Sequence, residues 1–214
     1  VEFLISTELT LIKLSENAAL YGKLEILKLL RSQDPPFEWN VNTFICAIKN
    51  GNLDTIMWMS SQNAPYHQNL YLVAIEYNKF DILKFFRKQY PNNKWNVDNE
   101  FGDEITKNCI KNGNLEMLEW IITEGIPYRF DENSCDIAAS YGNLHILKWL
   151  INKGYKIHHN SYCNVIKNGH LNVLRYMLQE NKELLENVKN IYKRACILKQ
   201  NRISAWLENN YDVK

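Results

Sequence analysis

The chain has 214 residues, of which 46% are hydrophobic and 23% are charged, and its formal net charge is only +1. This balance is typical of an ordinary globular protein that buries a sizeable core. Because the net charge is close to zero, the chain as a whole has no electrostatic field that would attract nucleic acid or an anionic membrane. No apolar run approaches the roughly 20 residues that cross a bilayer, and residues 1–8 lack the basic start of a signal peptide.

One short pattern recurs along the chain, and its first residues lie 27 to 35 positions apart. Self-similarity at such a period is typical of a stacked-repeat protein. The copies, in chain order, are YGKLEILKLL from residue 21, NGNLDTIMWM from 50, YNKFDILKFF from 77, NGNLEMLEWI from 112, YGNLHILKWL from 141 and NGHLNVLRYM from 168, followed by a fainter LKQNRISAWL from 198.

Each copy predicts two helices joined by a tight turn. In the copy from residue 141, the apolar residues Leu144, Leu147 and Leu150 recur every third position, as on one face of a helix. Just upstream, the pair Ala138-Ala139 belongs to a second helix-like run, where small side chains let two helices approach closely. Gly142 stands between the runs and can adopt a positive φ that ends the first helix. We therefore expect an all-α fold of helix, glycine turn, helix and short loop.

Two further columns run through the copies. The ninth place is mostly aromatic, and we expect these rings to pack between neighbouring repeats: Leu29, Trp58, Phe85, Trp120, Trp149, Tyr176 and Trp206. The five cysteines fall in the first helix of the units and form no CxxC pair, so we expect buried, reduced thiols in a reducing compartment: Cys46, Cys109, Cys135, Cys163 and Cys196.

The repeats predict one continuous array over residues 1–214. Residues 1–8 align with Leu147–Gly154, the end of a second helix, so we expect the end of a truncated upstream repeat and hence a fragment of a longer array. About six repeats lie between residues 9 and 185. Residues 186–214 form a degenerate C-terminal capping repeat, because Asn201 and Ser204 stand where other copies have apolar residues.

The stretch DIAASYGNLHILKWLINKG, from Asp136 to Gly154, resembles the ankyrin repeat, whose usual wording is T-P-L-H-x-A-A-x-x-G-H-L-E-x-V-x-x-L-L-x-x-G. AIKNGNLDTIMWM and NVIKNGHLNVLRYM fit the same frame. The T-P-L-H element is missing, and most units are four to six residues shorter than the family's repeat. The resemblance implies an ankyrin-type helix-turn-helix solenoid, and the shortness predicts short loops. The composition of the repeats, rich in Asn, Lys and Tyr, resembles that of the ankyrin arrays of large DNA viruses. This resemblance implies an intracellular location in the host cytoplasm or the virion.

The resemblance implies a protein-protein interaction scaffold and not an enzyme, although a fold alone does not establish a function. Two alternatives are the substrate-recognition part of a ubiquitin-ligase or signalling adaptor, and a structural component of a virion. The expected partner is another protein, and we expect no nucleic acid, membrane or small-molecule substrate. No nucleophile, phosphate-loop or dinucleotide motif occurs. The stretch HHNSYC from His158 has no matching second ligand pair, so we expect neither a metal nor a cofactor.

The resemblance also implies where a partner binds, because ankyrin partners usually touch the loops and the end of the first helix. The residues just before the turn alternate between tyrosine and lysine, which predicts a partner-binding ridge: Tyr21, Lys49, Tyr77, Lys111, Tyr141 and Lys167. Solvated surface residues are the alternative. Trp39 and Trp95 precede a first helix and are either hydrophobic staples or exposed anchors for the partner.

Overall fold

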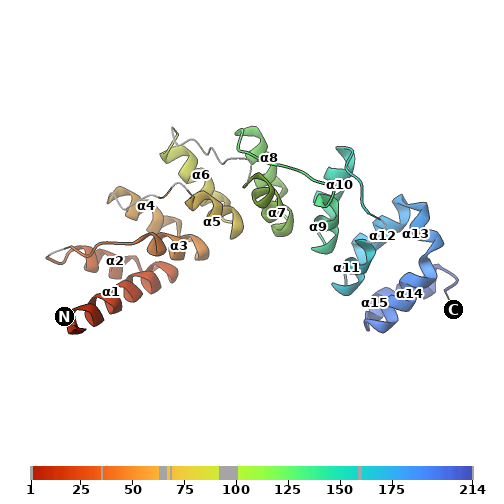
Figure 1. Cartoon of the computed structure of the whole chain (residues 1–214), viewed down its shortest axis with the longest axis horizontal. Helices are drawn as coiled ribbons and strands as arrows, with labels where there is room; N and C mark the ends of the chain where they lie inside the picture. The colour runs from red at the N-terminus through yellow and green to blue at the C-terminus, as the bar shows by residue number, and fades with distance from the viewer. Residues whose placement is uncertain are drawn as a thin grey trace. The chain divides into compact units, whose positions relative to one another are not determined.

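The computed structural model describes residues 2–34, 36–62, 67, 69–91, 101–158 and 161–213, with side chains from Leu9 onward except that of Glu183. These residues form fifteen α-helices and no strand, so the predicted all-α fold is confirmed. The helices belong to two compact units, residues 1–96 and 97–214, which we describe separately (Figure 1).

Unit 1 contains six helices: α1 (Glu2–Leu20), α2 (Leu24–Arg31), α3 (Val41–Asn50), α4 (Leu53–Ser61), α5 (Leu70–Glu76) and α6 (Phe80–Gln89). Unit 2 contains the other nine: α7 (Gly102–Asn112), α8 (Leu115–Thr123), α9 (Ser134–Ser140), α10 (Leu144–Asn152), α11 (Tyr162–Lys167), α12 (Leu171–Glu180), α13 (Lys182–Glu186), α14 (Val188–Ile197) and α15 (Asn201–Asn210).

The helices contact one another in pairs that match the sequence copies. The two helices of every copy touch, from α1 with α2 through α14 with α15. The first helices also touch in chain order, as α1, α3 and α5 in unit 1 and as α7, α9, α11 and α14 in unit 2. Each unit is therefore built from helix pairs whose first helices lie side by side.

The turn inside each pair has a left-handed residue at the second place of the copy. Gly142 has a φ of 77°, as predicted for a glycine that ends the first helix. Two copies lack the glycine, and there Asn78 and Lys199 adopt the same conformation with φ of 56° and 55°. The turn geometry is thus kept even where a side chain makes it less favourable.

The third place of the copy connects one pair to the preceding pair, a role that the sequence pattern did not reveal. The amide of Asn143 donates hydrogen bonds to the carbonyls of Ile110 and Lys111, at 2.6 and 3.0 Å. Equivalent bonds join residues about thirty positions apart elsewhere: Asn52 to the carbonyls of Ala19 and Leu20, Lys79 to that of Asn50, and Gln200 to that of Lys167. These bonds satisfy carbonyls at the end of a helix and set the register between pairs.

The core face of the second helix differs in one position from the expected face. In α10, Ile146, Leu147 and Leu150 are fully buried, whereas Leu144 at the fourth place is half-buried. The sixth place points inward because it is one helical turn before the tenth. The ninth-place Trp149 is half-buried at the boundary between pairs, where its ring lies 5.6 Å from that of Phe130 and its Nε1 donates to Glu119.

The helix α1 runs without a break from Glu2 to Leu20, because no glycine or proline interrupts it.

The cysteines differ in part from the buried thiols that were expected. All five cysteines are free; Cys109 and Cys135 are buried as expected, whereas Cys46 and Cys163 are half-buried. Cys196 is exposed, because no further helix among the described residues covers the outer side of α14.

Candidate functional site

The ridge residues of unit 2 stand at the ends of three adjacent first helices. Lys111 is the penultimate residue of α7, Tyr141 directly follows α9 and Lys167 is the last residue of α11, and all three side chains are exposed. Side-chain amides hold these ends in register: Asn143 donates to the Lys111 carbonyl, Asn168 to that of Ser140 at 2.7 Å, and Gln200 to that of Lys167 at 3.0 Å. Because α7 contacts α9 and α9 contacts α11, the three ridge residues form one row on unit 2.

The ridge residues of unit 1 form a second row of the same kind. Tyr21 is 67% exposed and Tyr77 is 37% exposed. The ammonium group of Lys49 lies 5.3 Å from the centre of the Tyr77 ring, which is the distance of a cation–π contact. Lys49 and Tyr77, which are successive members of the alternating tyrosine and lysine pattern, are thus in contact between neighbouring helix pairs.

Trp39 does not belong to either exposed row. Its side chain is only 5% exposed, its ring meets that of Trp58 edge-on at 5.3 Å, and the Arg31 guanidinium lies 5.4 Å from the ring centre. These contacts make it a packing residue at the start of α3 and contradict its use as an exposed anchor. Trp95 lies outside the described residues.

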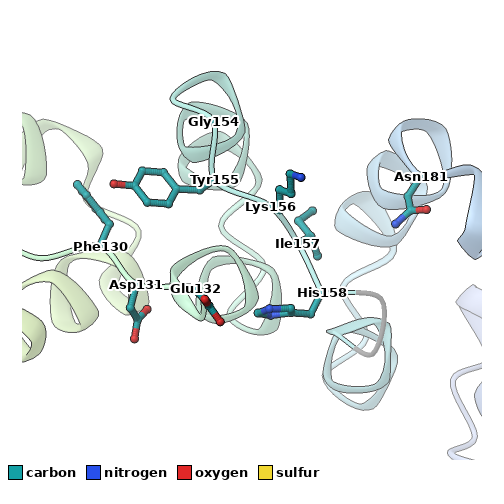
Figure 2. Close-up of a pocket in the computed structure, with 9 residues that line it drawn as sticks. All are labelled: Phe130, Asp131, Glu132, Gly154, Tyr155, Lys156, Ile157, His158 and Asn181. Atoms are coloured by element: carbon teal, nitrogen blue, oxygen red, sulfur yellow. The ribbon is translucent and has the colours of Figure 1, made fainter.

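Unit 2 has an open cavity of about 660 Å³ between two loops, the one after α8 and the one after α10 (Figure 2). Phe130 and Tyr155 pack against each other across it, with ring centres 5.4 Å apart. Figure 2 shows the His158 ring turned toward Glu132. The lining residues are Phe130, Asp131, Glu132, Gly154, Tyr155, Lys156, Ile157, His158 and Asn181.

A hydrogen-bonded cluster around Asp136 lies beside this cavity. The Asp136 carboxylate is 2.6 Å from the His158 Nδ1 and accepts the His158 backbone N–H at 3.1 Å. It also accepts the hydroxyl of Ser161. The hydrogen bond with Asp136 raises the pKa of His158, and the charges of Asp136 and Glu132 act in the same direction. Helix α9 is thereby tied to the loop that precedes α11, an arrangement that the sequence pattern did not predict.

The cluster contains serine, histidine and aspartate, but its hydrogen bonds do not connect them as in a catalytic triad. A serine nucleophile needs a hydrogen bond to the imidazole that takes its proton. Here the hydroxyl of Ser161 donates to the carboxylate instead. A search of the described residues finds no group of three or more His, Cys, Asp or Glu side chains that could hold a metal ion. The hydrogen bonds of the cluster hold the loop before α11 against α9.

Across the described part of the chain, no helix is long and apolar enough to cross a membrane. Comparison with models of known protein families and with curated proteins finds no match. The resemblance to ankyrin repeats therefore rests on the residues of this chain alone.

Proposed function

We propose that this chain is an ankyrin-type repeat solenoid that acts as a non-catalytic, intracellular protein-interaction scaffold. It binds another protein through the rows of tyrosine and lysine at the ends of its first helices. The observation that carries this proposal is the register of these side chains, since successive ridge residues stand beside one another on each unit and remain exposed.

The composition of the rows supports a binding role. Large aromatic side chains are usually buried for the apolar area they carry, yet Tyr21 and Tyr141 are 67% and 53% exposed. Tyrosine is enriched among the residues that dominate binding energy at protein interfaces. Its phenol offers both an apolar surface and a hydrogen-bonding group, while the neighbouring ammonium groups add charge.

Two further observations fit the same proposal. The helix pairs of each unit contact their neighbours in chain order, as the units of a stacked repeat do. The five free cysteines fit a reducing, intracellular compartment, because small extracellular domains commonly pair their thiols. An adaptor or a virion component would use the same rows within a larger assembly.

Photo-crosslinking from the ridge tests the proposal. A photoreactive amino acid replaces Tyr141 in cells that make the protein, and the captured partner is identified by mass spectrometry. Lys182, which is exposed at the start of α13 and not at the end of a first helix, is the control position. We expect a discrete crosslinked protein from position 141 and none from position 182.

Substitutions then separate binding from folding. Tyr77→Ala, Lys111→Ala and Tyr141→Ala should each weaken binding of the captured partner by about 1–2 kcal/mol. The free energy of unfolding should change by less than about 0.5 kcal/mol in Lys111→Ala and Tyr141→Ala, as for exposed positions in general, and by about 0.5–1 kcal/mol in Tyr77→Ala, which also loses its contact with Lys49. A loss of binding that only follows a loss of stability would contradict a binding role for the ridge.

A further inference from the structure

Positive charge is concentrated in one part of unit 2. Residues 137–207 contain eleven lysines and arginines but only three glutamates and no aspartate, although the whole chain has a net charge of only +1. The three glutamates all lie between positions 180 and 186, at the end of α12 and in α13. Asp136 in α9 and Glu208 in α15 flank this stretch; Asp136 contacts His158, and Glu208 accepts the Tyr192 hydroxyl.

The cations of the second helices are engaged with aromatic rings. The Lys148 ammonium lies 5.2 Å from the centre of the Tyr176 ring in the next pair, and the Arg175 guanidinium lies 5.6 Å from that of Trp206. The Lys153 ammonium lies 4.7 Å from the centre of the Trp149 ring. The first two contacts strengthen packing between pairs and the third lies within one pair, so this set of cations already has a structural role.

The cations of the first helices are differently placed. Lys111, Lys167 and Lys193 are exposed, and no ion pair joins them to a carboxylate within the part of the chain that the structure describes. Two carboxylates of the first helices in unit 2 have cationic partners of their own: Asp103 is 3.7 Å from the Arg129 guanidinium, and Asp136 contacts His158. The side of unit 2 that carries the ridge thus presents positive charge that the protein itself does not neutralise.

The row of ridge residues continues into α14 with apolar side chains. Ile197 and Leu198 occupy the places that Lys167 and Asn168 occupy in α11, and α14 contacts α11. The hydrogen bond from Gln200 to the Lys167 carbonyl sets the register between them. Ile197 is 78% exposed, more than any other large hydrophobic residue among the described ones, and Leu198 is 36% exposed.

We propose that this surface of unit 2 binds an extended protein segment that carries a large apolar side chain next to several aspartates or glutamates. The inference rests on the proposed function and specifies its partner. The acidic residues pair with Lys111, Lys167 and Lys193, and the apolar side chain covers Ile197 and Leu198. Unpaired surface cations attract and orient an acidic partner, while burial of exposed aliphatic area adds affinity.

The aliphatic end of the row favours an acidic protein over a nucleic acid. Single-stranded nucleic acids bind basic grooves whose aromatic side chains stack on successive bases. Ile197 and Leu198 offer no ring for stacking, and Tyr141 is the one ring among the residues at the ridge positions at the ends of α7, α9, α11 and α14. A partner with its own apolar side chain complements this surface better.

Fluorescence anisotropy with three labelled probes tests the proposal on the full chain. The probes are a short poly-glutamate peptide with one central leucine, the same peptide with serine in place of the leucine, and a poly-thymidine oligonucleotide of similar length. We expect the leucine peptide to bind most tightly and its affinity to fall as salt is added, because salt screens exposed charges.

Matched variants assign the contacts. Lys167→Glu combined with Lys193→Glu should lower the affinity for the leucine peptide about five- to tenfold. Ile197→Ser should remove the preference for leucine over serine. The controls Lys182→Glu and Leu185→Ser change exposed residues of the same types on α13 and should leave both affinities unchanged.

Three outcomes would overturn the proposal: no binding of either peptide, equal effects of ridge and control variants, or tighter binding of the oligonucleotide that Ile197→Ser does not alter. None of them bears on the crosslinking from position 141. A partner captured there without affinity for the acidic peptides would leave the scaffold function standing and refute only the partner chemistry.

Discussion

At the scale of single residues, the contact between His158 and Asp136 makes unit 2 sensitive to pH. The hydrogen bond and the negative charge of Asp136 raise the pKa of His158 above its ordinary value of about 6.5. A pKa that folding raises means that the folded protein binds the proton more tightly than the unfolded chain does. The resulting stability is fully present below the unfolded pKa and is lost as the pH rises through the folded pKa.

We therefore predict that unit 2 is more stable near about pH 6 than near about pH 8, and that Asp136→Asn reduces this difference. A titration of the His158 ring protons by NMR should show its pKa falling toward the ordinary value in Asp136→Asn. His67→Gln, in unit 1, is the control and should leave the titration of His158 unchanged. An unaltered His158 pKa in Asp136→Asn would show that the contact is not formed in solution.

At the scale of helices and turns, the glycines of unit 2 that have a positive φ fall into two groups that differ in their neighbours. A Cβ added to Gly142 would lie 2.6 Å from Nδ1 of the His170 ring in the next pair. A Cβ added to Gly154 would meet no atom within 4 Å. The first position needs glycine for both conformation and space, whereas the second needs it for conformation alone.

Gly154→Ala should therefore cost about 1 kcal/mol of unfolding free energy, from the left-handed backbone alone. Gly142→Ala should cost at least about 2 kcal/mol, because the His170 ring must also move. Urea denaturation of both variants measures the difference. Adding His170→Ala to Gly142→Ala should recover part of the loss, and equal losses in the two glycine variants would refute the steric contribution.

At the scale of the whole molecule, unit 2 has a core cluster of its own. This continuous cluster of buried residues extends from Ile110 to Leu207 and includes side chains from α7 and from α9 through α15. Because a compact unit with its own core can fold by itself, we predict that residues 97–214 fold when they are produced alone. Circular dichroism should show helix and a cooperative thermal transition, and a non-cooperative melt would refute this.

Much of the fold could be predicted from the sequence because the relevant forces act within a few residues. The spacing of Leu147 and Leu150 is the period of a helix, and Gly142 adopts the left-handed turn that a side chain disfavours. These signals recur in register, so they indicated the helix pairs, the turns and the tyrosine and lysine positions. The exposure of Tyr141 and Lys111 follows from the same pattern, since both lie just before the turn.

The tertiary structure decided what depends on residues distant in the chain. Asn143 looked like an ordinary turn residue, but its amide bonds the carbonyls of a helix more than thirty positions earlier. Trp39 is buried because Trp58 and Arg31 cover it, and Cys196 is exposed because no further described helix lies outside α14. The periodicity of apolar residues in the sequence indicates which residues share a face of one helix. The contacts of a residue with other helices are determined only when the helix pairs pack together.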